Sequence, residues 1–336
     1  MYQKFSDFIR DKKRICIIQA ENPDGDSLGS ATALDYALKD LEVSLYCPVD
    51  MPKYLYYFQD AGRVTNEFDF KADGYIIVDT AAKILLSKVL DDNAISNRLF
   101  GMPVLVIDHH ETEDDLDFPH EKIIETRPAC TELIYDILKE CGIDVPVESA
   151  DAILMGIMSD TLGLTSASVT AHSFNVCAEL LQIGSNIAEL EEKRREFMKK
   201  SPRIMDYKAD LMKRVDFSLD NALATVHIPW DEIAEFSDEY NPNVLILEEL
   251  RMVEGVRVAV AIKTYPDGKV TGKIRTMGNA NIAEKIAGYF GGGGHEYAAG
   301  FRTYDTNYEE VLADLVRIVP EFLADLPEPE RRVYEF

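Results

Sequence analysis

Positive charge is scarce in this chain. Its 336 residues include 35 Lys and Arg against 60 Asp and Glu, which gives a formal net charge of -25. So acidic a surface repels phosphate backbones over most of its area, and this disfavours a protein that binds long DNA or RNA. A small anionic substrate that is held through bound cations is compatible with the same charge.

Long apolar segments and paired cysteines are missing too. No stretch approaches the roughly 18 consecutive apolar residues of a membrane span, and residues 1–14 contain basic residues but no apolar core of a signal peptide. The five cysteines are widely spaced and form no C-x-x-C motif, as is usual for thiols in a reducing compartment. We therefore expect a cytoplasmic protein with no membrane association.

The first half of the chain alternates apolar strands with helical patterns. Four short apolar runs are typical of parallel strands buried on both faces. They span 15–18, 43–47, 75–78 and 104–107. Helical spacing covers 27–41, 81–90 and much of 130–181. The expected fold class is α/β, with an N-terminal parallel-sheet domain over residues 1–190 and helices on both faces of its sheet.

The second half has a different composition. Residues 191–215 are rich in Lys and Arg and predict a helical connector, whose charge either covers a solvated helix face or attracts an anionic substrate. Residues 216–336 predict a smaller α+β domain. Its expected strands are 222–228, 256–264 and 269–275, with a hairpin turn at 265–268, and its expected helices are 281–290 and 308–323.

Acidic and histidine side chains follow three of the predicted strands. They are Asp24 and Asp26 after the first strand, Asp79 after the third, and Asp108, His109 and His110 after the fourth. One Asp after a strand means little, because Asp is a common helix N-cap. Three such sites share the carboxyl edge of a parallel sheet, where ligands bind.

So many carboxylates at close range repel one another unless cations neutralise them. Carboxylate mixed with imidazole suits Mn²⁺ or a similar ion better than Ca²⁺, and Mg²⁺, Zn²⁺ and Fe²⁺ are the alternatives. Asp160 ends an apolar helical stretch. It is either a further ligand or a turn residue in water.

Three motifs, in this order, closely resemble those of the DHH–DHHA1 phosphoesterases. They are residues 22–30 (NPDGDSLGS), 108–110 (DHH) and 291–295 (GGGGH). In that family two Mn²⁺ or Mg²⁺ ions activate a water that hydrolyses a phosphoester. The resemblance covers nearly the whole chain and implies an N-terminal DHH domain and a C-terminal DHHA1 domain.

The resemblance also implies roles for individual residues. It makes Asp24 a ligand of the first metal, Asp79 a bridge between both ions, and Asp26, His109 and Asp160 the other ligands of the second metal. Asp108 would orient His109, and His110 would face the scissile phosphate. In the DHHA1 domain, Arg275 and the loop with Gly292, Gly293, Gly294 and His295 would bind the terminal phosphate and base of the substrate. A flexible linker or a helix cap is the other interpretation of the glycine run.

One position departs from the family pattern. A His normally stands four residues before the first Asp of the motif, and here that residue is Ala20. We therefore expect two ions with the first site weakened. Strand alternation places Gln19 and Glu21 on the opposite face, and Glu21 is the first candidate if another side chain replaces the histidine. The alternative is a non-catalytic protein that only binds nucleotides.

The GGGGH loop and the short length point to the stand-alone members of the family rather than to pyrophosphatases, long DNA exonucleases or membrane-bound phosphodiesterases. The expected substrates are short RNA or small nucleotides such as pApA and pAp, with cyclic dinucleotides as a further alternative. The sequence does not fix the oligomeric state, and a homodimer is the one assembly considered.

Overall fold

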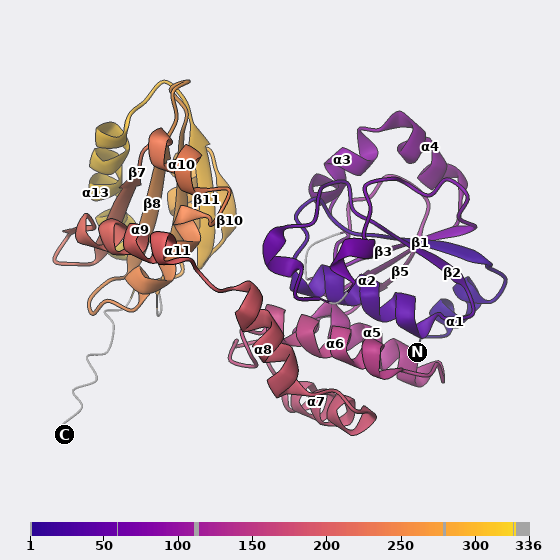
Figure 1. Ribbon diagram of the computed structural model, residues 1–336. Helices are drawn as coiled ribbons and strands as arrows, with labels where there is room; N and C mark the ends of the chain where they lie inside the picture. The colour runs from indigo at the N-terminus through magenta and orange to yellow at the C-terminus, as the bar shows by residue number, and fades with distance from the viewer. Residues whose placement is uncertain (1, 59, 111–113, 278–279, 325, 327–336) are drawn as a thin grey trace. The chain divides into compact units, whose positions relative to one another are not determined.

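The computed structural model describes residues 2–58, 60–110, 114–277, 280–324 and 326 (Figure 1). The chain divides into two compact units, Met1–Lys199 and Lys200–Phe336. The boundary between them falls inside the segment expected as a connector. Among the described residues, no helix combines the length and the apolar character needed to cross a bilayer.

The N-terminal unit contains a five-stranded, wholly parallel sheet. Its strand order is β2-β1-β3-β4-β5. The strands are β1 (Arg14–Ile18), β2 (Glu42–Tyr46), β3 (Gly74–Val78), β4 (Val104–Asp108) and β5 (Glu121–Ile124). The four strands expected from the sequence are confirmed. The sequence missed β5, whose burial is mixed and which carries no continuous apolar run.

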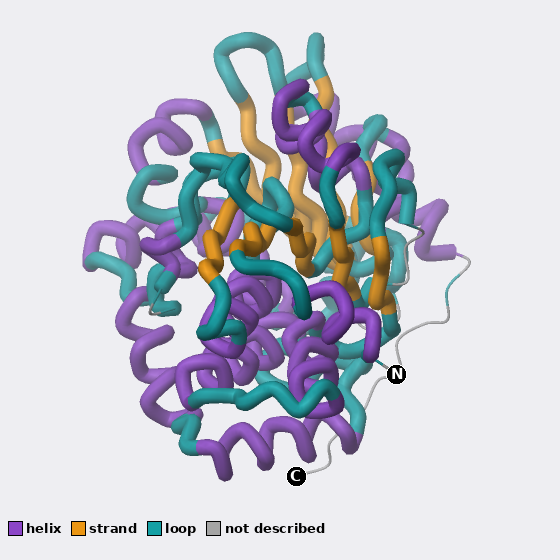
Figure 2. The backbone as a smooth tube through the Cα atoms, turned by 90° about the vertical axis from the view of Figure 1, so that its right-hand side faces the viewer, coloured by secondary structure: helices purple, strands orange, loops and turns teal. Residues whose placement is uncertain are grey.

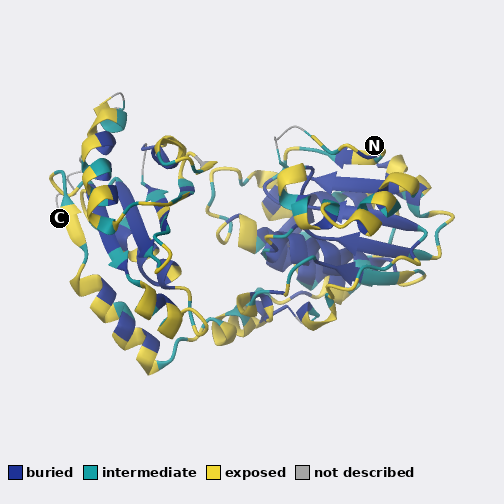
Figure 3. Cartoon of the chain, turned by 90° about the horizontal axis from the view of Figure 1, so that it is seen from above, coloured by how far each residue is buried: buried dark blue, intermediate teal, exposed yellow. Residues whose placement is uncertain are grey.

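Helices cover both faces of this sheet, as the α/β class requires. Alternate side chains of the strands face α2, α5 and α6 on one side and α3 and α4 on the other. The α-helices of this unit are α1 (Gln3–Ile9), α2 (Gly25–Ala37), α3 (Ser87–Leu90), α4 (Asn93–Gly101), α5 (Cys130–Glu140), α6 (Val147–Asp160), α7 (Ala171–Ile183) and α8 (Ile187–Phe197). Three short 3₁₀ helices are η1 (Lys53–Leu55), η2 (Ala61–Arg63) and η3 (Lys83–Leu86). Figure 3 shows how burial concentrates in the strands.

The C-terminal unit contains a six-stranded mixed sheet of order β10-β11-β9-β8-β7-β6. Its strands, orange in Figure 2, are β6 (Asp216–Ser218), β7 (Leu223–Ile228), β8 (Val258–Thr264), β9 (Val270–Thr276), β10 (Gly293–His295) and β11 (Ala298–Thr303). The helices are α9 (Pro202–Lys213), α10 (Trp230–Phe236), α11 (Pro242–Arg251), α12 (Ala283–Tyr289) and α13 (Tyr308–Ala324). Helices α12 and α13 pack on one face and α9, α10 and α11 on the other. This is the expected α+β architecture.

Part of the glycine run is a strand, not the loop that the sequence predicted. Gly293, Gly294 and His295 form β10, which pairs antiparallel with β11. A Cβ atom at Gly292 would lie 2.2 Å from the carbonyl oxygen of Gly300, and one at Gly294 would lie 2.7 Å from that of Ala298. These two glycines are therefore required by the close approach of the backbone to β11.

Helix α2 lies against α6 with almost no space between their backbones. A Cβ atom at Gly29 would lie 2.7 Å from the carbonyl oxygen of Ala152 and 3.2 Å from the Cα of Gly156. The two helix backbones can approach this closely only because Gly29 and Gly156 carry no side chain. Because Asp24 is the N-cap of α2 and Asp160 is the last residue of α6, this packing also sets the distance between two candidate ligands.

We predict that Gly29→Ala lowers the free energy of unfolding by about 1–3 kcal/mol, because the added methyl group overpacks the contact between α2 and α6. Urea unfolding followed by circular dichroism measures the change. Gly101→Ala is the matched control, since no atom lies within 4 Å of its Cβ position in α4, and it should be neutral or stabilise by up to about 1 kcal/mol. Equal stability of the two variants would contradict the close-packing argument.

Candidate active site

Three neighbouring strands deliver the candidate residues to one edge of the N-terminal sheet. Strand β3 pairs in parallel with β1 and with β4, so the residues that follow these strands share the carboxyl edge. The structure brings six predicted groups together there, and α6 adds a seventh. They are Asp24, Asp26, Asp79, Asp108, His109, His110 and Asp160.

Asp24 and Asp26 occupy the start of α2. The Asp24 side chain caps the helix, with Oδ1 accepting from the backbone N–H groups of Asp26 (3.0 Å) and Ser27 (2.9 Å). Asp26 is buried and turns toward α5 instead. Its Oδ2 accepts from the Cys130 N–H (2.5 Å), and its Oδ1 accepts from the Thr131 N–H (3.0 Å) and hydroxyl (2.6 Å). Asp26 therefore fills the cap of α5, whose own N-cap residue makes no side-chain bond.

Asp79 follows β3 in an unusual backbone conformation. Its φ is 63°, in the left-handed region that non-glycine residues seldom adopt. The side chain is buried, and Oδ1 lies 3.2 Å from Nε2 of His109 without a well-directed hydrogen bond. Burial and the neighbouring charge of Asp26 raise the pKa of Asp79 well above its ordinary value. A buried carboxylate oxygen that lacks a partner is what a bound cation would satisfy.

The His109 ring lies at the centre of the cluster. Its Nδ1 donates to the Arg127 carbonyl oxygen at 2.8 Å, so Nε2 faces the carboxylates. The distances from Nε2 are 3.2 Å to Asp79 and 3.7 Å each to Asp26 and Asp160. Burial acts to lower the pKa of His109, but the 3.2 Å contact with the Asp79 carboxylate and the charge of Asp26 outweigh it and raise that pKa to about 10.

Asp160 belongs to the cluster and is not an isolated turn residue. It is the last residue of α6, its side chain is 37% exposed, and Oδ2 faces Nε2 of His109. Burial and the charge of Asp26 raise its pKa to about 6. Within the part of the chain that the structure describes, two sets of side chains have ligand atoms close enough together to hold an ion. They are Asp26 with His109 and Asp160, and Asp79 with His109 and His110.

The expected partnership between Asp108 and the His109 ring is wrong. Oδ1 of Asp108 accepts from Nδ1 of His110 at 2.7 Å and from the backbone N–H of His109 at 2.8 Å. The carbonyl of Arg127 takes the place expected for Asp108 beside the His109 ring. Burial would raise the pKa of Asp108, but its bonds to His110 outweigh this effect and lower it.

The first metal position has fewer candidate ligands. Ala20 is buried, and its methyl side chain has no atom that could bind a metal ion. Glu21 is already engaged, since its Oε2 accepts from the Ser87 hydroxyl (2.8 Å) and the Lys88 N–H (3.0 Å). This removes the reason for treating Glu21 as the replacement ligand. Gln19 is fully buried, and neither its amide nitrogen nor its amide oxygen has a hydrogen-bond partner.

Sequence reasoning missed the groups that hold the ligands in place. The Arg127 carbonyl and the N–H groups of Cys130 and Thr131 are backbone atoms, which leave no mark on the sequence. Arg275 lies on β9, in register with Ala298 of β11. His295 lies on β10, but its side chain is outside the described residues.

Three other histidines have partners outside the cluster. His120 pairs with Asp114, His172 with Asp136, and His227 with Thr264.

Known proteins share both units. The family described as "DHH family, N-terminal domain" matches residues 14–157, and the "DHHA1 domain" matches residues 232–325. The bifunctional oligoribonuclease and PAP phosphatase NrnA of Thermus thermophilus is 31% identical over 301 residues, which cover 87% of this chain and 86% of that protein. A probable manganese-dependent inorganic pyrophosphatase of Streptococcus agalactiae is 29% identical over 187 residues, 52% of this chain and 58% of that protein.

The fold has a solved counterpart. The crystal structure of an exopolyphosphatase-related protein from Bacteroides fragilis superposes with a TM-score of 0.82 at 20% sequence identity. The match covers 96% of this chain and 97% of that one. This likeness supports the fold of the chain.

The raised pKa of His109 predicts that metal binding depends on pH. Near neutral pH the metal-free ring holds a proton where an ion would bind, because its pKa is about 10. The ion must displace this proton, so apparent affinity for Mn²⁺ should rise roughly tenfold per pH unit between about pH 6.5 and 8.5. Calorimetric titrations in buffers of different ionisation enthalpy measure both the affinity and the proton released. Affinity that is independent of pH, without proton release, would contradict this assignment.

Proposed function

This chain belongs to the DHH family, and we propose that it is a divalent-metal-dependent phosphoesterase of short oligoribonucleotides and small nucleotides such as pApA and pAp. One observation carries the proposal: Nε2 of His109 lies 3.2–3.7 Å from carboxylate oxygens of Asp79, Asp26 and Asp160. The dual activity in the name of the Thermus relative supports the substrate class.

The ligand set proposed for the second ion is Asp26, Asp79, His109 and Asp160, and Asp24 with Asp79 would hold the first. Divalent ions bound there would lower the pKa of a water molecule and polarise a phosphoryl oxygen. Mn²⁺ or Mg²⁺ suits this mixture of carboxylates and imidazole. The name of the Streptococcus relative supports manganese.

The protein's own contribution is to hold these groups in fixed positions. Three donors from the start of α5 orient Asp26, and the Arg127 carbonyl fixes which ring nitrogen of His109 faces the ions. Asp108 orients His110, whose ring is 41% exposed and is proposed to contact the scissile phosphate. This exposure leaves the ring accessible to a substrate.

Binding of the substrate's terminal phosphate is assigned to the C-terminal unit. Arg275 has a planar guanidinium suited to a bidentate contact with phosphate. We propose that four further residues bind this phosphate together with Arg275, namely Gly292, Gly293, Gly294 and His295. The acidic charge of the whole chain is consistent with substrates of a few nucleotides.

Ala20 supports a second candidate function, a nucleotide-binding protein that has lost hydrolysis. A substrate panel separates the two functions, with pApA, pAp, a short RNA and a cyclic dinucleotide each incubated with Mn²⁺ or Mg²⁺. Release of mononucleotide or phosphate supports the enzyme. Tight binding of the same compounds without any product supports the binding protein and overturns the proposal.

Asp79→Asn should reduce metal-dependent turnover by at least a hundredfold, because Asp79 is the one carboxylate proposed to contact both ions. The amide has nearly the same shape but no charge, so the fold should be kept. Asp144→Asn is the matched control, since Asp144 is an exposed residue whose salt bridge is to Lys39, beyond the far end of α2. Turnover retained in the Asp79 variant would exclude the two-ion assignment.

Ala20→His should move activation by Mn²⁺ to lower concentrations. The wild-type chain is expected to hold one ion firmly and a second only at high concentration, because water fills the positions that an imidazole would occupy. Activity and calorimetric titrations of both proteins measure the shift. If wild type already binds two ions tightly, or if the curve does not move, another residue supplies the missing ligand, and the unpaired amide of Gln19 is the first to test.

A further inference from the structure

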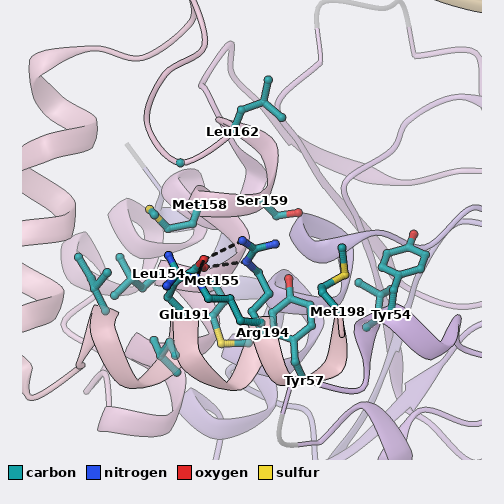
Figure 4. Close-up of a pocket in the computed structure, with 15 residues that line it drawn as sticks. Tyr54, Tyr57, Leu154, Met155, Met158, Ser159, Leu162, Glu191, Arg194 and Met198 are labelled. Carbon is teal, nitrogen blue, oxygen red and sulfur yellow. Dashed lines mark hydrogen bonds and ion pairs between the residues drawn. The ribbon is translucent and has the colours of Figure 1, made fainter. Parts of the chain in front are cut away.

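A cavity of about 630 Å³ lies in the N-terminal unit beside the candidate active site (Figure 4). Its walls are helices α6 and α8 and residues 54–57. Sites for small molecules have volumes of roughly 300–1,000 Å³ and combine apolar walls with a few polar groups. The cavity fits this description, and none of the residues assigned above to metal or phosphate binding lines it.

The cavity adjoins the metal cluster on two sides. Ser159 lines it and directly precedes Asp160 at the end of α6. Tyr54 lines it as well, and its hydroxyl donates to the Pro23 carbonyl oxygen at 3.3 Å, next to Asp24. A ligand in the cavity would therefore lie close to whatever binds at the candidate metal ligands.

The apolar lining suits a flat ring. Tyr54 and Tyr57 supply aromatic surface, and Met155, Met158 and Met198 supply flexible sulfur-containing side chains. Bases stack on aromatic side chains with little regard to sequence, and methionine adapts to rings of different shape. Figure 4 shows Tyr54 and Met198 on one side of Arg194, with Met155 and Met158 on the other.

The polar part of the lining can bind the edge of such a ring. Arg194 contacts both carboxylate oxygens of Glu191 at 2.7 Å each, and Arg195 adds a further contact at 2.9 Å. Two guanidinium groups against one carboxylate leave a net positive charge and several N–H donors. Carbonyl and ring-nitrogen acceptors on a base match these donors.

The rim carries an exposed apolar side chain on a strained backbone. Leu162 is 70% exposed and lines the cavity. Its φ is 51°, and Gly163 and Leu164 also have positive φ values. Leucine seldom adopts this conformation, and such strain is often found at ligand-binding sites.

We propose that this cavity binds the base of a nucleotide whose phosphate lies at the metal cluster. The inference rests on the proposed function, because it takes the scissile phosphate to bind there. It adds a base-binding site within the N-terminal unit, made by α6, α8 and residues 54–57. Affinity for substrates would then depend on a base, although the chemistry concerns only the phosphate.

Met198→Trp tests the cavity by filling it. Met198 lines the cavity and caps α8, whereas the neighbouring Phe197 is exposed and does not line it. Phe197→Trp is therefore the matched control. Calorimetry on the full chain compares AMP with ribose 5-phosphate, which has the same phosphate and sugar but no base. This measurement needs no turnover.

We expect wild type and Phe197→Trp to bind AMP at least tenfold more tightly than ribose 5-phosphate. Met198→Trp should lose this preference for AMP, while its affinity for ribose 5-phosphate should equal that of wild type. Leu162→Asn should lose part of the preference for AMP, and its fold should be kept because asparagine tolerates the left-handed backbone conformation. Equal affinities in wild type, or a preference that survives in both cavity variants, would overturn the inference.

Turnover separates this inference from the proposed function. Met198→Trp should raise KM for pApA at least tenfold and leave kcat within twofold. An analogue of pApA without the base that is proposed to enter the cavity should have the same KM with Met198→Trp as with wild type. Base-dependent binding without turnover in wild type would support the cavity site and refute the enzyme. Turnover with equal KM for pApA in all variants would refute the cavity site alone.

Discussion

Repulsion among buried carboxylates is the constraint on which the N-terminal unit depends. Asp26, Asp79 and Asp160 all direct oxygen atoms at one imidazole nitrogen, and burial raises the pKa of each. The protonated ring of His109 offsets this repulsion in the metal-free chain. A divalent ion would do so more effectively, because it brings two charges to the same place. The cluster is therefore costly when empty and favourable when filled.

The scaffold around the cluster offsets this cost with rigid backbone contacts. Asp26 is fixed by the first N–H groups of α5, where the helix dipole favours a negative charge. The close approach of α2 and α6 at Gly29 holds the helices that carry Asp24 and Asp160 at a fixed separation. Stability and function are thus linked through the same contacts, and a change at Gly29 should affect both.

The basic segment after residue 190 has two structural roles. Arg203 and Lys208 of α9, and Arg214 at its C-cap, form salt bridges with glutamates of α10 and α11 within the C-terminal unit. In α8, Arg194 and Arg195 share Glu191 at the wall of the cavity.

The sequence alone determined the α/β class, four of the strands and the convergence of acidic residues at one sheet edge. Hydrophobic periodicity is a local property of the chain, and strands that alternate with helices pair in parallel, with their carboxyl ends at one edge. The sequence could not determine which groups orient the ligands. The Arg127 carbonyl and the amide of Cys130 are backbone atoms, so no residue type marks them. It also missed β5, whose burial is mixed, and the cavity between α6 and α8. Only tertiary packing decides which side chains of two helices leave a space between them, and that space is the site proposed for the base.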